Sequence, residues 1–247
     1  MTLRLLSYNI RHGGTGREQP IAEVIRDLAP DLVILQEARR PRVVEEIARE
    51  TGMAQWGARE GQSLGFLSRE PVRHVAWYKP RISRHAFVEI VPAAGDWRVF
   101  GVHLSAVHSA WTERRRTFEL RALLNAIAQH QHGPHLLIGD FNTVAPGEWL
   151  ETRKLPPRLR PLVWLSGGRI RWRTIQTVLD AGYRDAFRAL HPDVIGNTFP
   201  TWDPHVRLDY LFMPSRFVER VTVCAVGETS VARAASDHFP LIAEVTL

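Results

Sequence analysis

A carboxylate and a carboxamide follow a strongly apolar run near the middle of the chain. Asp140 and Asn142 stand two residues apart, directly after the run LLIG at residues 136–139. On an extended chain this spacing places both side chains on one face. Asp140 can then receive a proton from water while Asn142 donates a hydrogen bond to a phosphate oxygen, and hydrolysis of a phosphoester needs both functions close together. A turn built by these two side chains is the structural alternative.

Two further polar residues stand where apolar runs end in the first half of the chain. Asn9 precedes a glycine-rich loop, and Glu37 follows residues 32–36 in the segment LVILQE. A carboxylate at the end of a buried strand needs solvent, a partner or a cation. An amide at such a place can hold a phosphate oxygen or orient a metal ligand. The structural alternatives are a turn at Asn9 and helix capping by Glu37.

Two histidines and two acids complete the set of candidate residues. His103 ends an apolar run in the segment VHL, Asp209 stands inside another in RLDY, and Asp237 and His238 precede the last apolar run. A buried Asp209 needs a partner, and His238 is a suitable one because a carboxylate fixes an imidazole's tautomer and stabilises its cationic form. For His103, a core histidine satisfied by a neighbour is the structural alternative.

These side chains require strands that end on a common edge. Runs of β-branched and aliphatic residues predict the strands, and amphipathic runs between them predict helices. The first half alternates strand and helix, whereas residues 70–104 contain consecutive strands, which predicts mixed rather than purely parallel sheets. The predicted strands are residues 3–10, 32–36, 72–78, 99–104, 135–139, 208–213 and 242–247, and the predicted helices are residues 21–28, 43–50 and 113–129, the last capped by Thr112 and stopped by Gly133 and Pro134.

The 247 residues predict a single domain, because candidate site residues run from 9 to 238 and no linker-like segment divides them. Residues 145–175 stand apart as an irregular excursion in which prolines and glycines interrupt any regular element. This segment carries seven basic and two acidic residues, a net +5 of the chain's formal +6. We expect Arg169, Arg171 and Arg173 to bind the substrate, and a solvated loop is the alternative.

Charge and composition narrow the partners. A formal net charge of +6 and a pI near 10.2 favour polyanions such as nucleic acid or anionic lipid headgroups. The single cysteine, Cys224, excludes a disulfide within one chain and is expected to be a buried thiol. No apolar stretch is long enough to cross a membrane, and the first ten residues lack a signal-peptide pattern, which predicts a cytoplasmic protein. None of these features indicates an oligomeric state.

Six short motifs follow one another in an order that is typical of one family. In this order the chain resembles the endonuclease/exonuclease/phosphatase superfamily, which includes deoxyribonuclease I, exonuclease III, abasic-site endonucleases and neutral sphingomyelinases. The resemblance covers essentially the whole chain except residues 145–175. The motifs are Asn9, the LQE that ends at Glu37, the VHL around His103, the GDFN that ends at Asn142, the RLDY around Asp209 and the SDH that ends at His238.

This resemblance implies a fold and a metal site. The family fold is a four-layer α/β sandwich, in which two mixed β-sheets pack face to face with helices on the outside and the site lies along one edge. Glu37 would be the principal Mg²⁺ ligand, with Asn9 and Asp237 beside the metal or holding its waters. Oxygen ligands suit this hard cation, and Mn²⁺ would be a substitute.

The resemblance also implies roles in hydrolysis by in-line attack of water. Asp140 would orient and deprotonate the water, and Asn142 would hold a phosphate oxygen. His238, paired with Asp209, would stabilise the charge that develops on the phosphate. His103 would bind a non-bridging oxygen or protonate the leaving group.

The substrate remains a choice between classes. His103 is typical of the deoxyribonuclease I and sphingomyelinase-like branches, and abasic-site enzymes tend to carry Trp where this chain has Val206, which argues against abasic repair. The leading hypothesis is a nuclease or other nucleic-acid phosphodiesterase, and the alternative is a phospholipid or small-molecule phosphoesterase. A binding module without activity is a third hypothesis, which the intact site residues oppose. Trp202 is expected to face the substrate, with a packed tryptophan as the alternative.

Overall fold

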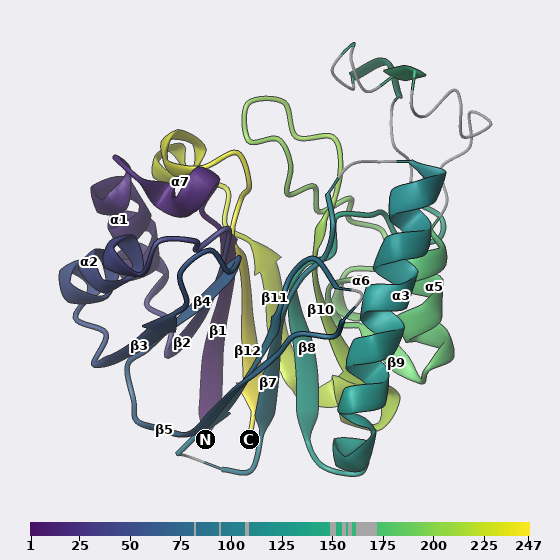
Figure 1. The fold of residues 1–247 in the computed structure, drawn as a ribbon, viewed down its shortest axis with the longest axis horizontal. Coiled ribbons are helices and arrows are strands. Elements are labelled where there is room, and N and C mark those ends of the chain that lie inside the picture. Colours follow the sequence, from purple (N-terminus) through teal and green to yellow (C-terminus); the bar gives the residue numbers. More distant parts are fainter. Residues whose placement is uncertain are drawn as a thin grey trace.

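The computed structural model describes residues 1–81, 83–93, 95–106, 109–148, 152–154, 157, 160–161 and 172–247. Two β-sheets lie face to face with helices on both outer sides (Figure 1). The first sheet contains β1 (Thr2–Asn9), β2 (Leu32–Gln36), β3 (Gln55–Ala58), β4 (Leu64–Ser68), β11 (Val221–Val226) and β12 (Leu241–Thr246). The second contains β5 (Val72–Tyr78), β6 (Phe87–Pro92), β7 (Arg98–His103), β8 (His135–Asp140), β9 (Tyr183–Asp185) and β10 (Asp209–Pro214).

Both sheets are mixed, as predicted. Their strand orders are β11-β12-β1-β2-β4-β3 and β5-β6-β7-β8-β10-β9. The pairs β1–β2 and β7–β8 are parallel, and the other neighbouring strands are antiparallel. Parallel neighbours bring their carboxyl ends to the same edge of a sheet. The residues that follow β1, β2, β7 and β8 therefore gather at one edge of the sandwich.

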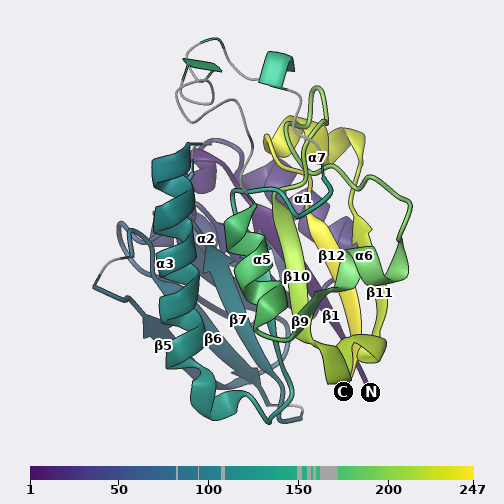
Figure 2. The ribbon, with the colours of Figure 1, turned by 90° about the vertical axis from the view of Figure 1, so that its right-hand side faces the viewer.

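Helices form the two outer layers. On the first sheet lie α1 (Glu18–Leu28), α2 (Pro41–Thr51) and α7 (Ser230–Ala235), and on the second lie α3 (Ala110–Ala126) and α5 (Arg173–Asp180), as Figure 2 shows. The short helix α6 (Ala186–Leu190) follows β9, and the described residues include 3₁₀ turns at His12–Gly14, Ala128–His130, Thr152–Lys154 and Ser215–Arg220. The described helices include none that is long and apolar enough to cross a membrane. The four-layer prediction is confirmed.

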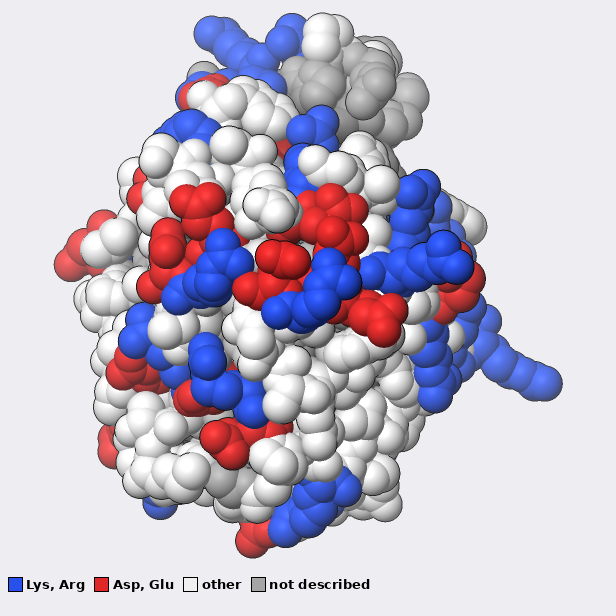
Figure 3. All heavy atoms as spheres, turned by 90° about the vertical axis from the view of Figure 1, so that its left-hand side faces the viewer, with Lys and Arg blue, Asp and Glu red and all other residues white. Residues whose placement is uncertain are grey.

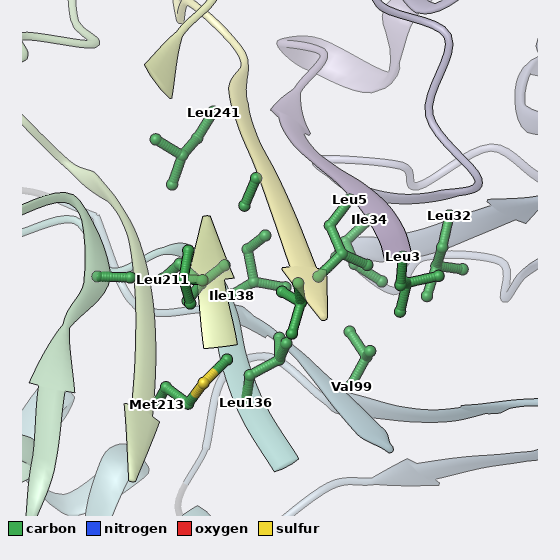
Figure 4. Packing of buried hydrophobic residues seen from close by; sticks show 14 of the residues in the cluster. Leu3, Leu5, Leu32, Ile34, Val99, Leu136, Ile138, Leu211, Met213 and Leu241 are labelled. Atoms are coloured by element: carbon green, nitrogen blue, oxygen red, sulfur yellow. The ribbon is translucent and has the colours of Figure 1, made fainter. Parts of the chain in front are cut away.

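The largest core lies between the two sheets (Figure 4). Leu5 and Ile34 from the first sheet pack against Val99, Ile138 and Leu211 from the second, and all five are essentially inaccessible to solvent. Alternate residues of these strands point to the opposite faces and pack against the outer helices. Apolar burial on both faces explains why the strand sequences read as continuous aliphatic runs.

Several element boundaries differ from the predictions. Ser109, not Thr112, is the N-cap of α3, and Thr112 completes a capping box by accepting a hydrogen bond from the Ser109 amide at 3.0 Å. The helix ends at Ala126 and a 3₁₀ turn follows, ahead of Gly133. Arg173 begins α5, so the irregular excursion ends earlier than residue 175. Cys224 is buried as expected, and burial raises its pKa.

Candidate active site

The site begins where β7, β8 and β10 run side by side. Register pairs His103 with Asp140 across the parallel β7–β8 ladder, and Asp209 with Asp140 across the antiparallel β8–β10 ladder. Gly139 makes this close pairing feasible, since its φ is 150° and an added Cβ would lie 1.9 Å from the Val102 carbonyl oxygen. Steric contact therefore requires a glycine before Asp140, independently of the chemistry of the site.

The chain turns directly after Asp140, so the predicted extended geometry is wrong and the turn alternative is right. Asn142 has a φ of 53°, and its backbone amide donates to Asp140 Oδ1 at 2.8 Å. This hydrogen bond closes an Asx turn. Asn142 adopts the left-handed region of the backbone, which asparagine tolerates well. The Asn142 side-chain Nδ2 also donates to Asp140 Oδ2 at 2.9 Å. The two side chains meet as expected, but through the turn.

Four side chains face one oxygen of Asp140. Besides Asn142, Asn9 from β1 donates through Nδ2 to Oδ2 at 3.0 Å, which connects the two sheets. Nε2 of His103 and Nε2 of His238 lie 3.8 and 4.0 Å from the same oxygen. Burial raises the pKa of Asp140 to about 7, against the opposing effects of the His238 charge and the two amides. Asp140 is thus the centre of the site.

His238 and Asp209 form the predicted pair. Nδ1 of His238 donates to Asp209 Oδ2 at 2.9 Å, so Nε2 points toward Asp140. Burial alone would lower the pKa of His238, but the charges of Asp209, Asp140 and Asp237 and the hydrogen bond to Asp209 outweigh it and raise the pKa to about 10. The imidazole is therefore cationic at neutral pH. Phe199 packs against its ring with centroids 4.8 Å apart.

His103 has a different environment although it faces the same carboxylate. Its ring stacks on His85 with centroids 4.6 Å apart and planes within 4°. Burial, together with the charges of His85, His238, Arg39 and Arg84, holds its pKa well below the usual value, so the ring is neutral. Nδ1 is buried without a partner among the described residues. Because an unpaired buried N–H costs more than an unpaired lone pair, the proton belongs on Nε2, which faces Asp140.

The predicted metal residues line the adjacent, more accessible side of the edge. Asn9 pairs with Gln36 across the β1–β2 ladder, and Glu37 is the residue that follows Gln36. Glu37 therefore lies one residue beyond the pair that contains Asn9. Glu37 has a φ of 60°, a strained conformation for a non-glycine residue. Its Oε2 accepts a hydrogen bond from the His12 amide at 2.5 Å, and its side chain is 23% exposed. Glu37 does not cap α2, whose N-cap is Arg40, so the capping alternative is wrong.

Asp237 lies close to Asn9 through a chain of polar contacts. Its Oδ2 is 3.4 Å from Nε of Arg11, whose amide donates to Asn9 Oδ1 at 3.0 Å. The neighbouring Ser236 hydroxyl donates to the Asn9 carbonyl at 2.6 Å. The side chain of Asp237 is 20% exposed. Glu37 and Asp237 thus supply partly exposed carboxylate oxygens, whereas Asn9 is buried and its Oδ1 already accepts from the Arg11 amide. Oxygen donors of this kind fit Mg²⁺.

A second group of ligand-type atoms is less suited to a cation. Asp140, Asp209 and His238 each have one ligand atom within 4.8 Å of the others. However, Nδ1 of His238 already donates to Asp209, and Asp140 Oδ2 already accepts from two amides. Asp209 Oδ1 alone lacks a partner among the described residues. The contacts describe a hydrogen-bonded cluster around a cationic imidazole, and a cation there would be repelled by His238.

The predicted substrate-binding residues have mixed outcomes. Trp202 is 62% exposed and lies beside the site, with its ring 6.3 Å from Phe199 and the Arg11 guanidinium 6.0 Å from its centre. Arg173 is exposed at the start of α5. Arg169 and Arg171 lie outside the described residues. Of the two predicted substrate-binding residues that the structure describes, Trp202 lies next to Phe199, which packs on His238.

Two supporting residues, Arg207 and His85, were not predicted from the sequence. Arg207 is almost fully buried, with Nη1 3.0 Å from Asp185 Oδ1 and Nε 2.8 Å from Glu148 Oε1. Its guanidinium also lies 4.4 Å from the ring centre of Tyr210 and fixes the strand that carries Asp209. The only sequence signal is the arginine in RLDY. No local pattern around His85 predicted that it would stack on His103.

Comparison with known proteins places this geometry in a family. Residues 6–238 match the model of the endonuclease/exonuclease/phosphatase family, and the chain belongs to this family. Membership of this family, together with the site side chains at one edge of the sandwich, confirms the predicted class of enzyme. This class is a hydrolase that acts on phosphoester bonds. Among curated proteins the search found no match.

Solved structures share the fold at low sequence identity. A 3′ phosphatase, NExo from Neisseria, bound to a product DNA hairpin, superposes with a TM-score of 0.73 at 17% identity, covering 99% of this chain and 100% of that one. An AP endonuclease from Archaeoglobus fulgidus has a TM-score of 0.70 at 17% identity, with the same coverage. An endonuclease/exonuclease/phosphatase from Beutenbergia cavernae has a TM-score of 0.74 at 22% identity, covering 100% of this chain and 72% of that one.

Proposed function

We propose that the chain is a divalent-metal-dependent nuclease or other nucleic-acid phosphodiesterase. The observation that carries this proposal is the convergence of Asn9, Asn142, His103 and His238 on Asp140 Oδ2. Two amide donors, one cationic ring and one neutral ring surround a single carboxylate with a raised pKa. Such a constellation suits the attack of water on a negatively charged phosphodiester.

The proposed reaction uses each group in a separate role. Asp140 accepts a proton from the attacking water, and the Asn9 and Asn142 amides hold its carboxylate in place through their hydrogen bonds. His238, held cationic by Asp209, stabilises negative charge on the phosphoryl oxygens as attack proceeds. Because His103 is neutral, its Nε2–H donates a hydrogen bond to a non-bridging oxygen rather than delivering a proton as an imidazolium.

The proposal assigns Mg²⁺, with Mn²⁺ as a substitute, to the partly exposed carboxylates of Glu37 and Asp237, with the buried Asn9 amide beside them. When bound, the cation supplies Lewis-acid neutralisation of charge on the phosphate. The chain's own contribution there is the left-handed backbone of Glu37, together with the hydrogen bond from the His12 amide that orients its carboxylate. Strain of this kind costs on the order of 1–3 kcal/mol and persists where a fixed geometry serves function.

Nucleic acid is the proposed substrate for two reasons. The formal charge of +6 favours a polyanion, and two solved structures with this fold are a 3′ phosphatase bound to a product DNA hairpin and an AP endonuclease. Anionic lipid and small phosphoesters are the competing substrates.

A substrate panel tests the proposal. The full chain would be assayed on single- and double-stranded DNA, RNA, sphingomyelin, phosphoinositides and bis-p-nitrophenyl phosphate, each with Mg²⁺, with Mn²⁺ and with EDTA. We expect hydrolysis of a nucleic acid with either cation and loss of turnover in EDTA. Glu37→Gln should raise the Mg²⁺ concentration needed for half-maximal activity, and exposed Glu45→Gln on α2 is the matched control. Hydrolysis of lipids alone, or full turnover in EDTA, would contradict the proposal.

A further inference from the structure

The outward face of α3 has an unusual composition. Its exposed residues Trp111, Arg114, Arg115, Phe118 and Arg121 recur at helical spacing and so share one face. The acids of this helix, Glu113 and Glu119, are buried on the inner side. Every exposed charge on α3 is therefore positive.

The opposite outer layer of the molecule differs. Figure 3 shows the face covered by α1 and α2, where acidic and basic side chains are interleaved. Arg49, for example, lies 3.8 Å from Glu46 and 3.5 Å from Glu50. Interleaved charges are ordinary for a solvated surface. The basic face of α3 is thus not a general property of this chain's helices.

The exposed aromatic residues border a hollow between α3 and α5. Trp111 is 74% exposed and Phe118 is 54% exposed, although neither supports the core. With Arg173 at the start of α5 and arginines of α3, they line a groove of about 610 Å³. Large aromatics on a concave surface are typical of a binding site.

The arginines of this groove are available to a ligand. Arg115 lies 3.8 Å from Glu119 Oε1, whereas Arg114, Arg121 and Arg173 form no ion pair with any described residue. Unpaired guanidinium groups beside aromatic rings match a ligand that alternates negative charge with flat rings.

The groove adjoins the active site through α3 itself. Glu113 binds the Thr174 amide of α5 at 2.7 Å and the Thr143 hydroxyl at 3.1 Å, and Thr143 directly follows Asn142 of the site. Arg115 also lies 3.8 Å from Glu119 Oε1, which accepts a hydrogen bond from the Arg84 amide at 3.0 Å, and Arg84 directly precedes His85, the ring that stacks on His103. The basic and aromatic surface therefore approaches the edge that holds His103 and Asp140.

We propose that the α3–α5 groove binds a single-stranded segment of nucleic acid next to the active site. The arginines contact phosphates, and Trp111 and Phe118 stack on bases. This inference rests on the proposed function, because it assumes that the chain's substrate is nucleic acid. A lipid surface is the competing ligand, but a hollow holding unpaired arginines between two rings suits a narrow chain better than a flat membrane.

Binding without hydrolysis tests the groove directly. The probe is a fluorescein-labelled oligothymidylate of about 20 nucleotides with phosphorothioate linkages, followed by fluorescence anisotropy with the full chain in Mg²⁺. We expect Trp111→Ala with Phe118→Ala to raise the Kd about tenfold or more, because base stacking is lost. Trp111→Phe, which keeps a ring, should retain most of the affinity.

The arginines are tested by salt. Arg114→Ala with Arg121→Ala should reduce the slope of log affinity against log salt by about 1.4 between roughly 50 and 200 mM, as two phosphate contacts are lost. The matched control is Arg42→Ala with Arg49→Ala on α2, which removes the same charge from the opposite layer and should leave the slope unchanged. Circular dichroism and thermal unfolding confirm that each variant is folded.

Three outcomes separate the hypotheses. If the groove variants bind the oligonucleotide like the wild type while the wild type hydrolyses DNA, the groove inference is wrong and the proposed function stands. If the groove variants lose binding to phosphatidylserine vesicles but not to the oligonucleotide, the groove is a lipid surface and the inference is wrong. If the groove governs oligonucleotide binding but the wild type hydrolyses no nucleic acid, groove binding is supported and the proposed function is wrong.

Discussion

Two imidazoles face the same oxygen of Asp140 from opposite sides, and they differ in charge. Both rings are nearly inaccessible to solvent, so burial penalises the charged form of each. His238 has Asp209 at 2.9 Å and its pKa rises to about 10, whereas His103 stacks on another imidazole and its pKa falls. The partner, rather than burial, therefore decides which ring is cationic.

The largest expected effect comes from removing the carboxylate that both rings face. Asp140→Asn should reduce kcat by on the order of 10³-fold, because the amide cannot accept the proton of the attacking water. Because both oxygens of Asp140 accept from amide N–H groups, the new NH₂ group loses at least one hydrogen bond, and thermal unfolding would check that the variant is folded. Steady-state kinetics on the substrate identified by the panel would measure the loss. Asp180→Asn on exposed α5 is the matched control, and near wild-type kcat in Asp140→Asn would show that another group is the base.

The second-largest effect on kcat should come from making the charges of the His238 and His103 rings alike. Asp209→Asn removes the negative charge that keeps His238 cationic while leaving one oxygen that can accept from its Nδ1–H. We expect kcat to fall by on the order of 10²-fold, with little change in the KM for substrate. If kcat is unchanged, the charge on His238 does not contribute to the reaction. The exposed Asp203→Asn provides the control for the same change of residue type.

A smaller effect on kcat is expected from a change beside the neutral ring of His103. His85→Ala removes the ring that stacks on His103 and should reduce kcat by roughly tenfold, since His103 keeps its place on β7 but loses an orienting neighbour. His85→Phe restores a flat ring and should recover most of the activity. Recovery would identify His85 as a positioning residue. Equal losses in both variants would contradict stacking as its role.

The sequence predicted the cationic half of the site better than the neutral half. Asp209 and His238 were paired in advance because a buried acid needs a partner, and this requirement is visible in a single strand. The stack of His85 on His103 joins a residue next to β6 to the end of β7. A contact between two uncharged rings leaves no signal in the sequence comparable to that of a buried acid. Most strands were also predictable, since their buried faces require long apolar runs.

The turns were less predictable than the strands. The apolar run before Asp140 favours an extended chain and leaves a turn as the alternative, but the structure has an Asx turn at Asn142. Left-handed backbone at Glu37 has no sequence mark either, since glutamate rarely adopts it. Both departures occur at proposed functional residues, where local preference is expected to yield to the geometry of a site.

A third buried histidine tests whether partner chemistry decides charge away from the site. His135, at the start of β8, lies 3.0 Å from the Gly133 carbonyl through Nδ1 and 2.6 Å from the Tyr183 hydroxyl through Nε2, and no carboxylate of the described residues forms an ion pair with it. Burial and the charges of Arg216, His130 and Arg98 lower its pKa, against the hydrogen bond to Gly133. Its folded-state pKa therefore lies below the unfolded value near 6.5, so the unfolded chain binds more protons as the pH falls below about 6.5.

The stability of the protein should decrease with acid over that range, and His135→Gln should make the decrease smaller while leaving kcat unaffected. Urea unfolding at a series of pH values measures the free energy of unfolding, and exposed His132→Gln is the control that should keep the wild-type slope. A slope that is unchanged in His135→Gln would mean that His135 takes up its proton equally in the folded and unfolded chains, and the rule drawn from His238 and His103 would then not extend beyond the site.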